Sequence, residues 1–428
     1  MSMRRVMAAI VAIGGAAMTT LGAAADGPAT KIPLCPGLTV VTAVNQVDGD
    51  YESIKTIESV TDSAVRIKYS VERKVVDLLL STVKLEKSTL YRTVRRADLQ
   101  SAFLYEQQFS TELPETIPET TAIGTSASVL NALKTKGEAK FGIFIPYTQI
   151  KPPIDRNVHP NVYDNQMVAT LARSGAAPVP LKVIVNDAPA QLPTIQAAGD
   201  FFGDKSEFFF LDDPDNPLAL MFRIGIGAIK PLSPEMLKAC EQSKAARMKP
   251  DFGPTGCDRP NGGDRDVLRV VKISYRCAAA PVSTSGGGPG RGALPDGGGA
   301  GAGGAGAIER ALTSTGKADI YSIFFSFNSD VIRDESEPTL KDIADVLRRH
   351  ADWRLGVNGH TDGIGGDQFN VDLSKRRAAA VKDALVKRYG IDPQRLTTSG
   401  LGKSQPKDTN DTLEGRAHNR RVELLRVS

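Results

Sequence analysis

Two charged residues, Asp362 and Arg377, could form a receptor for a small ligand in the last third of the chain. Asp362 closes the run Asn-Gly-His-Thr-Asp, directly after Thr361, and Arg377 lies in the run Val-Asp-Leu-Ser-Lys-Arg-Arg-Ala. A carboxylate binds an ammonium, whereas the planar fork of a guanidinium binds two carboxylate oxygens. Each such hydrogen bond contributes about 1.5–3 kcal/mol. The pair therefore suits a zwitterion, although a structural salt bridge or two unrelated charges remain alternatives on residue type alone.

A strand followed by a helix is predicted to position these two charges. Trp353, Leu355 and Val357 alternate with polar residues or Gly, which indicates a strand that ends near Asp362. A helix from residue 370 to 389 is predicted from an apolar stripe, and its N-cap would be Asn370. The stripe consists of Leu373, Ala380, Val381, Ala384 and Leu385. At ~100° per residue Arg377 lies about 40° from Leu373 on this helix, inside the stripe, where an arginine needs a partner.

The stretch from residue 308 to 428 resembles the peptidoglycan-associating domain of the OmpA family. The resemblance covers about 110 residues in the family's order and rests on several motifs. They are the run 358–362, Leu373-Ser-Lys-Arg-Arg-Ala378, Ile323 to Asp330, Gly400-Leu-Gly402 and Asn419-Arg-Arg-Val-Glu423. Lys403 departs from the family pattern, which commonly has an acidic residue there, but it lies away from the charged pair.

The resemblance implies which residues bind and what they bind. Asp362 and Arg377 match the positions that bind the diaminopimelate of the peptidoglycan stem peptide. Asn370 and Leu373 match positions that line the same pocket, and Thr361 adjoins them. Neither a cofactor nor a metal ion is expected. The resemblance also supports a fold-stabilising role for at least some of Arg416, Arg420 and Arg421.

The predicted elements of this stretch alternate between strands and helices. They are a strand at 321–327, a helix at 338–350, the strand that ends at Asp362, the helix at 370–389, a short strand at 396–400 and a last strand at 421–427. This β-α-β-α-β order predicts a mixed sheet with helices on one face. With a mostly β N-terminal domain, the fold class is α+β.

Residues 1–25 are predicted to be a secretory signal peptide. Arg4 and Arg5 precede an apolar run from 6 to 21, and Ala23-Ala24-Ala25 offers a cleavage site. An uncleaved anchor is the alternative, although the run is interrupted and shorter than a membrane span of about 20 residues. Cys35 lies too far along the chain to be a lipoprotein cysteine.

Four cysteines, Cys35, Cys240, Cys257 and Cys277, all precede the resembling stretch. An even number in an exported chain indicates disulfides. Of the three possible pairings we favour Cys240–Cys257 with Cys35–Cys277, because the second would join the two ends of the first domain. Free buried thiols are the alternative, and the absence of a C-x-x-C spacing argues against zinc.

Residues 26–279 are predicted to form a soluble, mostly β domain whose function we cannot assign. Strands are expected at 38–44, 64–70, 75–80, 139–145, 179–185, 207–211 and 218–226. Turns are expected at 186–189 and 212–216, and a helix at 233–248. We identify no catalytic motif in this block, so an enzyme is not expected.

An outer-membrane β-barrel with a periplasmic wall anchor is the alternative reading of this block. Only 6% of the chain is aromatic and Trp353 is its sole tryptophan, which is unlike a membrane barrel with aromatic girdles. Residues 280–307 are rich in Gly, Ala, Ser and Pro and are predicted to be a flexible linker.

The whole chain is therefore expected to be an exported wall-binding protein. The net charge of +4 is only mildly basic, and together with the export signal it argues against a nucleic-acid partner. The expected location is the periplasm of a Gram-negative bacterium, in association with the cell wall and outer membrane. A periplasmic or outer-membrane protein is a possible partner of residues 26–279.

Overall fold

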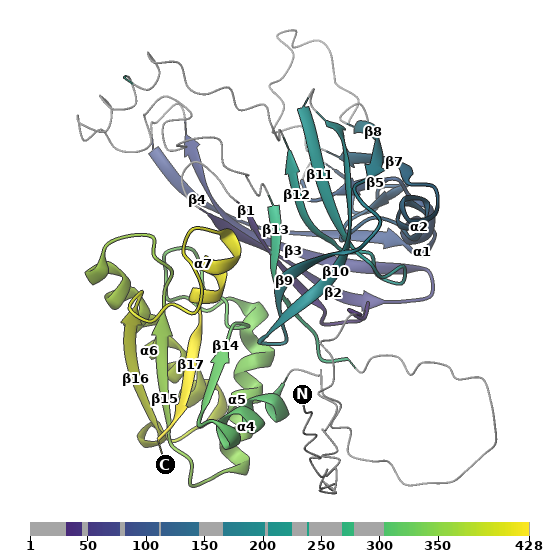
Figure 1. Ribbon diagram of the computed structural model, residues 1–428. Coiled ribbons are helices and arrows are strands. Elements are labelled where there is room, and N and C mark those ends of the chain that lie inside the picture. The colour runs from purple at the N-terminus through teal and green to yellow at the C-terminus, as the bar shows by residue number, and fades with distance from the viewer. Residues whose placement is uncertain are drawn as a thin grey trace, which may run out of the picture.

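The chain consists of two sheet-based parts that pack against one another (Figure 1). The computed structural model describes residues 31–44, 50–77, 82–110, 113–144, 166–201, 204–224, 238, 268–277 and 304–427. We call the part up to residue 277 the N-terminal region and residues 304–427 the C-terminal domain. The predicted signal peptide, Cys240, Cys257 and nearly all of the predicted linker and of the helix at 233–248 lie outside the described residues.

The described residues of the N-terminal region form a 13-stranded sheet. Its strands are β1 (Thr39–Val44), β2 (Tyr51–Val60), β3 (Ala64–Asp77), β4 (Thr82–Arg95), β5 (Leu104–Glu106), β6 (Thr120–Thr121), β7 (Glu138–Phe144), β8 (Gln166–Arg173), β9 (Val179–Val185), β10 (Ala188–Phe201), β11 (Asp204–Leu211), β12 (Ala219–Ile224) and β13 (Leu268–Ser274). Their order is β4-β3-β2-β1-β13-β12-β11-β10-β8-β7-β5-β6, and β9 pairs with both β10 and β13. Helices α1 (Arg96–Ser101) and α2 (Ala127–Thr135) accompany the sheet.

Aromatic residues fill the core of the N-terminal region. Phe141 is fully buried, and its ring centroid lies 5.1 Å from that of Phe208 and 5.4 Å from that of Phe210. Edge-on packing of this kind contributes stability in addition to the stability gained from burying the ring surfaces. Phe208 and Phe210 alternate along β11, which pairs with β12 on either side of the predicted turn at 212–216. The mostly β character expected of this part is thus confirmed.

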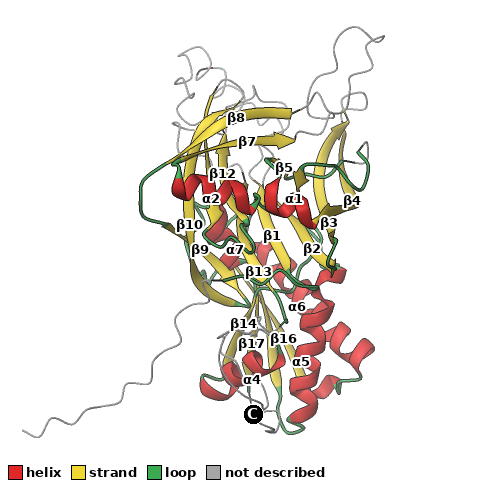
Figure 2. Ribbon diagram, turned by 90° about the vertical axis from the view of Figure 1, so that its right-hand side faces the viewer, coloured by secondary structure: helices red, strands yellow, loops and turns green. Residues whose placement is uncertain are grey.

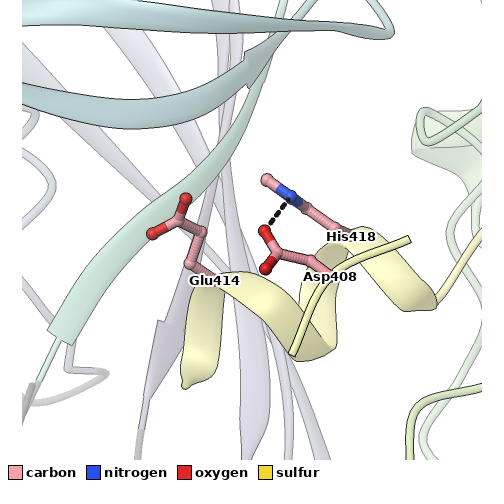
Figure 3. Close-up of side chains that lie close together, drawn as sticks. All are labelled: Asp408, Glu414 and His418. Atoms are coloured by element: carbon pink, nitrogen blue, oxygen red, sulfur yellow. Dashed lines mark hydrogen bonds and ion pairs between the residues drawn. The ribbon is translucent and has the colours of Figure 1, made fainter. Parts of the chain in front are cut away.

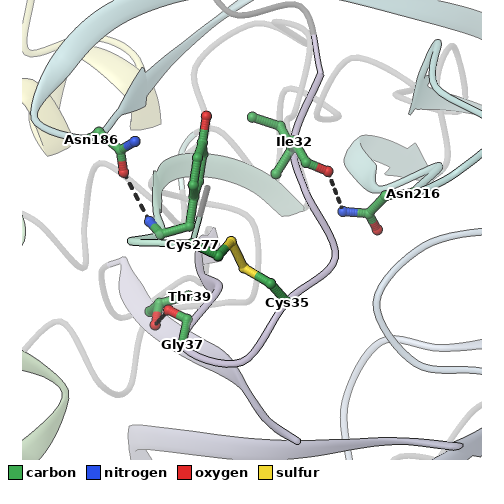
Figure 4. Close-up of a disulfide and its surroundings, with 8 residues drawn as sticks. Ile32, Cys35, Gly37, Thr39, Asn186, Asn216 and Cys277 are labelled. Carbon is green, nitrogen blue, oxygen red and sulfur yellow. Dashed lines mark hydrogen bonds between the residues drawn. A yellow bond between two sulfur atoms is a disulfide. The ribbon is translucent and has the colours of Figure 1, made fainter. Parts of the chain in front are cut away.

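A disulfide between Cys35 and Cys277 joins the two ends of this region (Figure 4). The bond connects residues 242 positions apart, just before β1 and just after β13, which are antiparallel neighbours. The favoured pairing of these two cysteines is therefore confirmed. Closing so long a loop restricts the unfolded chain and stabilises the folded one.

The C-terminal domain is built on a four-stranded mixed sheet in the order β14-β17-β15-β16. Its elements are α4 (Ala305–Ser314), β14 (Lys317–Ile320), η4 (Asp334–Ser336), α5 (Glu337–Arg349), β15 (Leu355–His360), α6 (Asp367–Tyr389), η5 (Pro393–Arg395), β16 (Leu396–Gly402), α7 (Leu413–Asn419) and β17 (Val422–Arg426). Strands β15 and β16 are parallel and the other pairs antiparallel. Residues of α4, α5 and α6 share one apolar core with one face of this sheet.

The structure corrects three boundaries predicted for this domain. The first strand is β14 at 317–320 and not 321–327, because the N–H groups of Tyr321 and Ser322 donate to the carboxylate of Asp187 instead of to β17. Helix α4 begins at Ala305, inside the predicted linker, and Ile308 packs in the core. The N-cap of α6 is Gly366, so Asn370 lies within the helix.

One face of strands β3, β2, β1 and β13 meets the C-terminal domain, and α7 lies beside β1 and β13 (Figure 2). The contact has an apolar centre that contains Val41, Ala43, Ile54 and Val271 from the sheet, with Phe324, Leu413 and Ala417 from the C-terminal domain. Ion pairs surround it, such as Lys68–Glu335 at 3.4 Å and Arg276–Asp342 at 2.6 Å. Among the described residues, no helix is long and apolar enough to cross a membrane.

Candidate ligand-binding cavity

A cavity of about 310 Å³ lies where the two parts of the chain meet. All five residues that the sequence singled out line it: Thr361, Asp362, Asn370, Leu373 and Arg377. The N-terminal region supplies another part of the wall, including Asp50, Glu52, Glu72 and Lys272. The predicted strand-to-helix placement therefore brings the opposite charges to one cavity, but this cavity belongs to both parts of the chain.

Asp362 follows β15 and is held by two hydrogen bonds. Its Oδ1 accepts from the backbone N–H of Ile364 at 3.1 Å, and its Oδ2 accepts from Nη1 of Arg420 at 2.7 Å. The expected alternative of a direct salt bridge to Arg377 is therefore wrong. Arg420 takes that place because it precedes β17, the antiparallel neighbour of β15.

Arg377 projects from α6 and keeps a largely uncompensated charge. Its Nε donates to the carbonyl of Ser329 at 2.9 Å, and its guanidinium lies 4.9 Å from the ring centroid of Phe325. No carboxylate of the described residues lies within 4 Å of it. Burial, together with the charge of Arg420, lowers the pKa of Arg377 to about 10, so the group stays cationic at neutral pH. Such a group stabilises an anion that enters the cavity.

Arg420 connects the two halves of the cavity. It pairs with Asp362 on one side and with Oε1 of Glu52 on β2 on the other. Burial opposes ionisation of Glu52, but Lys272 and Arg420 outweigh it and lower the pKa of Glu52 to about 2. Glu52 is therefore held as an anion. The sequence motifs include Arg420, but they did not predict that it pairs with Glu52, which lies 368 positions away in the chain.

Glu72 of β3 closes the rim of the cavity from the N-terminal side. Its carboxylate accepts from Oγ of Ser326 and from the N–H of Phe327, both at 2.9 Å, and pairs with Lys87 at 3.0 Å. Lys68, Ser70 and Glu72 alternate along β3 and therefore share the face that meets the C-terminal domain. Neither Glu72 nor Glu52 belongs to a recognisable motif, and only their alternation along a strand could have pointed to them.

The remaining predicted residues shape the wall instead of presenting charge. Asn370 is buried, and its Nδ2 donates to the carbonyl of Ile364 at 2.9 Å, which fixes the loop after Asp362. Leu373 is 5% exposed and supplies apolar surface. The N–H of Thr361 donates to the carbonyl of Gly402 at 2.9 Å.

His360 is a buried neutral group in the same wall. It is 2% exposed, and neither ring nitrogen has a hydrogen-bond partner among the described residues. Burial, reinforced by the charge of Arg421, lowers the pKa of His360 to about 4. The ring is therefore uncharged at neutral pH and contributes shape and polarity to the wall.

A second cluster, Asp408, Glu414 and His418, lies at α7 outside this cavity (Figure 3). One ligand atom from each lies within 4.8 Å of the others, which is a spacing that a metal ion could use. Nδ1 of His418 already contacts Oδ2 of Asp408 at 3.1 Å, and Glu414 pairs with Arg269 of β13 at 2.5 Å. The cluster thus contains a contact of its own and an ion pair that joins α7 to the N-terminal region.

Comparison with known proteins finds similarity to one protein family in the C-terminal domain. Residues 324–420 match the model of the OmpA family. Outer membrane porin F of Pseudomonas aeruginosa is 42% identical over 99 residues, which are 23% of this chain and 28% of that protein. Peptidoglycan-binding protein ArfA of Mycobacterium bovis is 44% identical over 86 residues, which are 20% of this chain and 26% of that protein.

A solved structure, the cell wall anchor of the T6SS from Pseudomonas aeruginosa, aligns at 32% identity. The alignment covers 27% of this chain and 94% of that chain, with a TM-score of 0.24. This chain spans less than a third of the length of the two relatives named above. As the motifs around Asp362 and Arg377 indicated, residues 324–420 form a domain of the OmpA family.

Proposed function

We propose that this protein binds peptidoglycan non-covalently through the C-terminal domain and thereby attaches to the cell wall. The observation that carries the proposal is the presence of Asp362 and Arg377 in the wall of one cavity, within an OmpA-family domain. A relative that shares this segment is a peptidoglycan-binding protein. The location that fits is the envelope of a Gram-negative bacterium.

The ligand group that fits the cavity best is the diaminopimelate of the stem peptide. Arg377 is available to pair with a ligand carboxylate, because among the described residues it has no carboxylate partner within 4 Å. Asp362 receives the ammonium beside its existing contact with Arg420, since a carboxylate accepts several hydrogen bonds. The charges are fixed before the ligand arrives, which suits binding without catalysis, and we propose no enzymatic step.

Co-sedimentation of the full chain with purified peptidoglycan tests this proposal. We expect Arg377→Ala and Asp362→Ala each to reduce the retained fraction at least tenfold, because each removes one charge-assisted contact. Arg376→Ala is the matched control: its side chain is 51% exposed on the same helix and pairs with Asp330 at 3.6 Å, outside the cavity. Wild-type retention by both cavity variants would contradict the site assignment.

A second candidate function is an outer-membrane channel with a wall anchor. It is favoured by the similarity to outer membrane porin F, which is limited to 28% of that protein. Against it, the N-terminal region packs aromatic side chains such as Phe141 and Phe208 into its interior. Solute efflux from liposomes that contain the full chain would support the channel.

The N-terminal region itself would connect the wall to a periplasmic or outer-membrane protein. Photo-cross-linking in cells from exposed positions such as Lys182 on β9 tests this part of the proposal. Capture of one specific envelope protein, absent from a control without irradiation, is the expected result.

A further inference from the structure

Lys272 places a charged group of the N-terminal region in the cavity wall. It is 5% exposed and lies on β13. Its Nζ lies 3.7 Å from Oε1 of Glu52 and 5.8 Å from the ring centroid of Phe324. Within the described residues this ammonium has no hydrogen bond of 3.5 Å or shorter. A buried ammonium is costly without close partners, so a position for an additional acceptor is present.

A β-bulge directs Lys272 toward the C-terminal domain. Val41 pairs with Lys272 and Thr42 pairs with Val270, so Val271 is the extra residue on β13. Successive side chains of a regular strand point to opposite faces, whereas a bulge can re-aim one of them. Here Val271 belongs to the interface cluster with Phe324, and the neighbouring Lys272 lies near the same ring.

Around Nζ of Lys272, cationic side chains outnumber the carboxylates that pair with them. Among the described residues, Lys272, Arg377 and Arg420 have only two carboxylates within 4 Å, Glu52 and Asp362. Glu52 is shared between Lys272 and Arg420, while Arg377 has no carboxylate within 4 Å among the described residues. Burial lowers the pKa of Lys272; the charge of Glu52 opposes this shift, whereas the nearby charges of Arg420 and Arg377 act in the same direction as burial. A ligand carboxylate next to Nζ would offset both effects.

We propose that Lys272 is a ligand-contacting residue that binds a second carboxylate of the wall peptide. The inference rests on the proposed function, in which Arg377 binds the first carboxylate and Asp362 the ammonium. It adds that both parts of the chain build the site. The cavity then selects an amino acid with two carboxylates over an otherwise identical one with a single carboxylate.

Binding of meso-diaminopimelate and of lysine to the full chain, measured by calorimetry, tests the role of Lys272. The two ligands share the amino-acid end, but lysine has a hydrogen in place of the second carboxylate. One charge-assisted contact corresponds to about a tenfold or larger preference for diaminopimelate in the wild type. We expect Lys272→Met to reduce this preference to less than about threefold while the affinity for lysine changes little.

Lys68→Met is the matched control for domain docking. It removes the ion pair with Glu335, which also joins the two parts of the chain, but Lys68 does not line the cavity. We expect this variant to keep the wild-type preference. The proposal is overturned if Lys272→Met keeps the wild-type preference for diaminopimelate. It is also overturned if Lys68→Met loses as much of this preference as Lys272→Met does, because Lys272 would then act only through docking of the two parts.

The two hypotheses fail in distinguishable ways. If the wild type binds neither ligand nor peptidoglycan, the proposed function and the role of Lys272 are both wrong. If the wild type binds peptidoglycan and Arg377→Ala abolishes this binding, but Lys272→Met leaves the ligand preference intact, only the role of Lys272 is wrong. Thermal unfolding of each variant confirms that it is folded at the measuring temperature.

Discussion

Arg420 sets the charge balance of the cavity, because it holds two carboxylates from different parts of the chain. Asp362 and Glu52 would repel one another without this guanidinium between them, and both are largely shielded from solvent. Breaking a buried pair on one side typically costs about 3–5 kcal/mol, since it leaves an uncompensated charge. The same residue therefore stabilises the fold and orients the carboxylate that is proposed to receive the ligand ammonium.

His360 predicts a specific dependence of stability on pH. Burial lowers its pKa to about 4 in the folded chain, from a model-compound value of 6.5. The folded state therefore binds fewer protons than the unfolded state between these values. The stability contributed by neutral His360 is complete above pH 6.5 and is lost as the pH falls to about 4, by roughly 3 kcal/mol.

Denaturant unfolding of the wild type and of His360→Leu between pH 7 and pH 4 measures this contribution. Between pH 7 and pH 4 we expect the free energy of unfolding of the wild type to fall by about 3 kcal/mol more than that of the variant, because the leucine cannot take up a proton. Carboxylates that titrate in the same range are common to both proteins and cancel in the comparison. Parallel losses in the two proteins would show that His360 carries no such linkage.

At the scale of elements, the close packing of α6 on β15 and β16 sets the distance between Arg377 and Asp362. A Cβ at Gly359 of β15 would lie 2.1 Å from the carbonyl oxygen of Ser374 in α6. A Cβ at Gly400 of β16 would lie 2.6 Å from the carbonyl oxygen of Val371. Both glycines are needed because helix backbone, which cannot move aside as a side chain can, occupies the space.

Gly359→Ala is expected to move α6 away from the sheet and to weaken both folding and binding. Overpacking against a backbone atom typically costs about 1–3 kcal/mol. Gly356→Ala in the same strand is the control, because a Cβ there would lie 3.6 Å from its nearest neighbour, an ordinary contact. Unfolding midpoints and peptidoglycan co-sedimentation should separate the two variants, and equal behaviour would contradict the packing argument.

At the scale of the whole molecule, the interface decides how the cavity is built. An apolar centre with Phe324 on one side and Ile54 and Val271 on the other is surrounded by ion pairs. The carboxylates of Glu52 and Glu72 reach the C-terminal domain from the same face of the sheet. We therefore expect the proposed ligand binding and the contact between the two parts to be coupled.

Phe324→Ala tests this coupling. The residue is 4% exposed, and its truncation should cost about 3–5 kcal/mol, mostly at the interface. We expect calorimetry to resolve separate unfolding transitions for the two parts of the variant, where the wild type shows a coupled one. Ile343→Ala, which opens the core of the C-terminal domain away from the interface, should lower stability without separating the transitions.

Local sequence was sufficient for much of the C-terminal domain. The helix predicted at 338–350, the strand that ends near Asp362 and the strand at 396–400 agree with α5, β15 and β16 to within a few residues, because their apolar periodicity is strong. The turns at 186–189 and 212–216 carry their own Asn, Asp and Pro signals. The strand predicted at 321–327 failed, since a distant carboxylate, Asp187, takes its first backbone donors.

Sequence by itself determined the family of residues 324–420 and the residue types of the candidate site, because a motif keeps its chemistry and spacing within one domain. Only the tertiary structure decided that Asp362 pairs with Arg420 and that Glu52, Glu72 and Lys272 complete the cavity. These contacts join residues tens to hundreds of positions apart on the faces of a sheet. No local pattern specifies them, since the Asp362–Arg420 pair depends on the pairing of β15 with β17 and the positions of Glu52, Glu72 and Lys272 depend on how the two parts of the chain pack together.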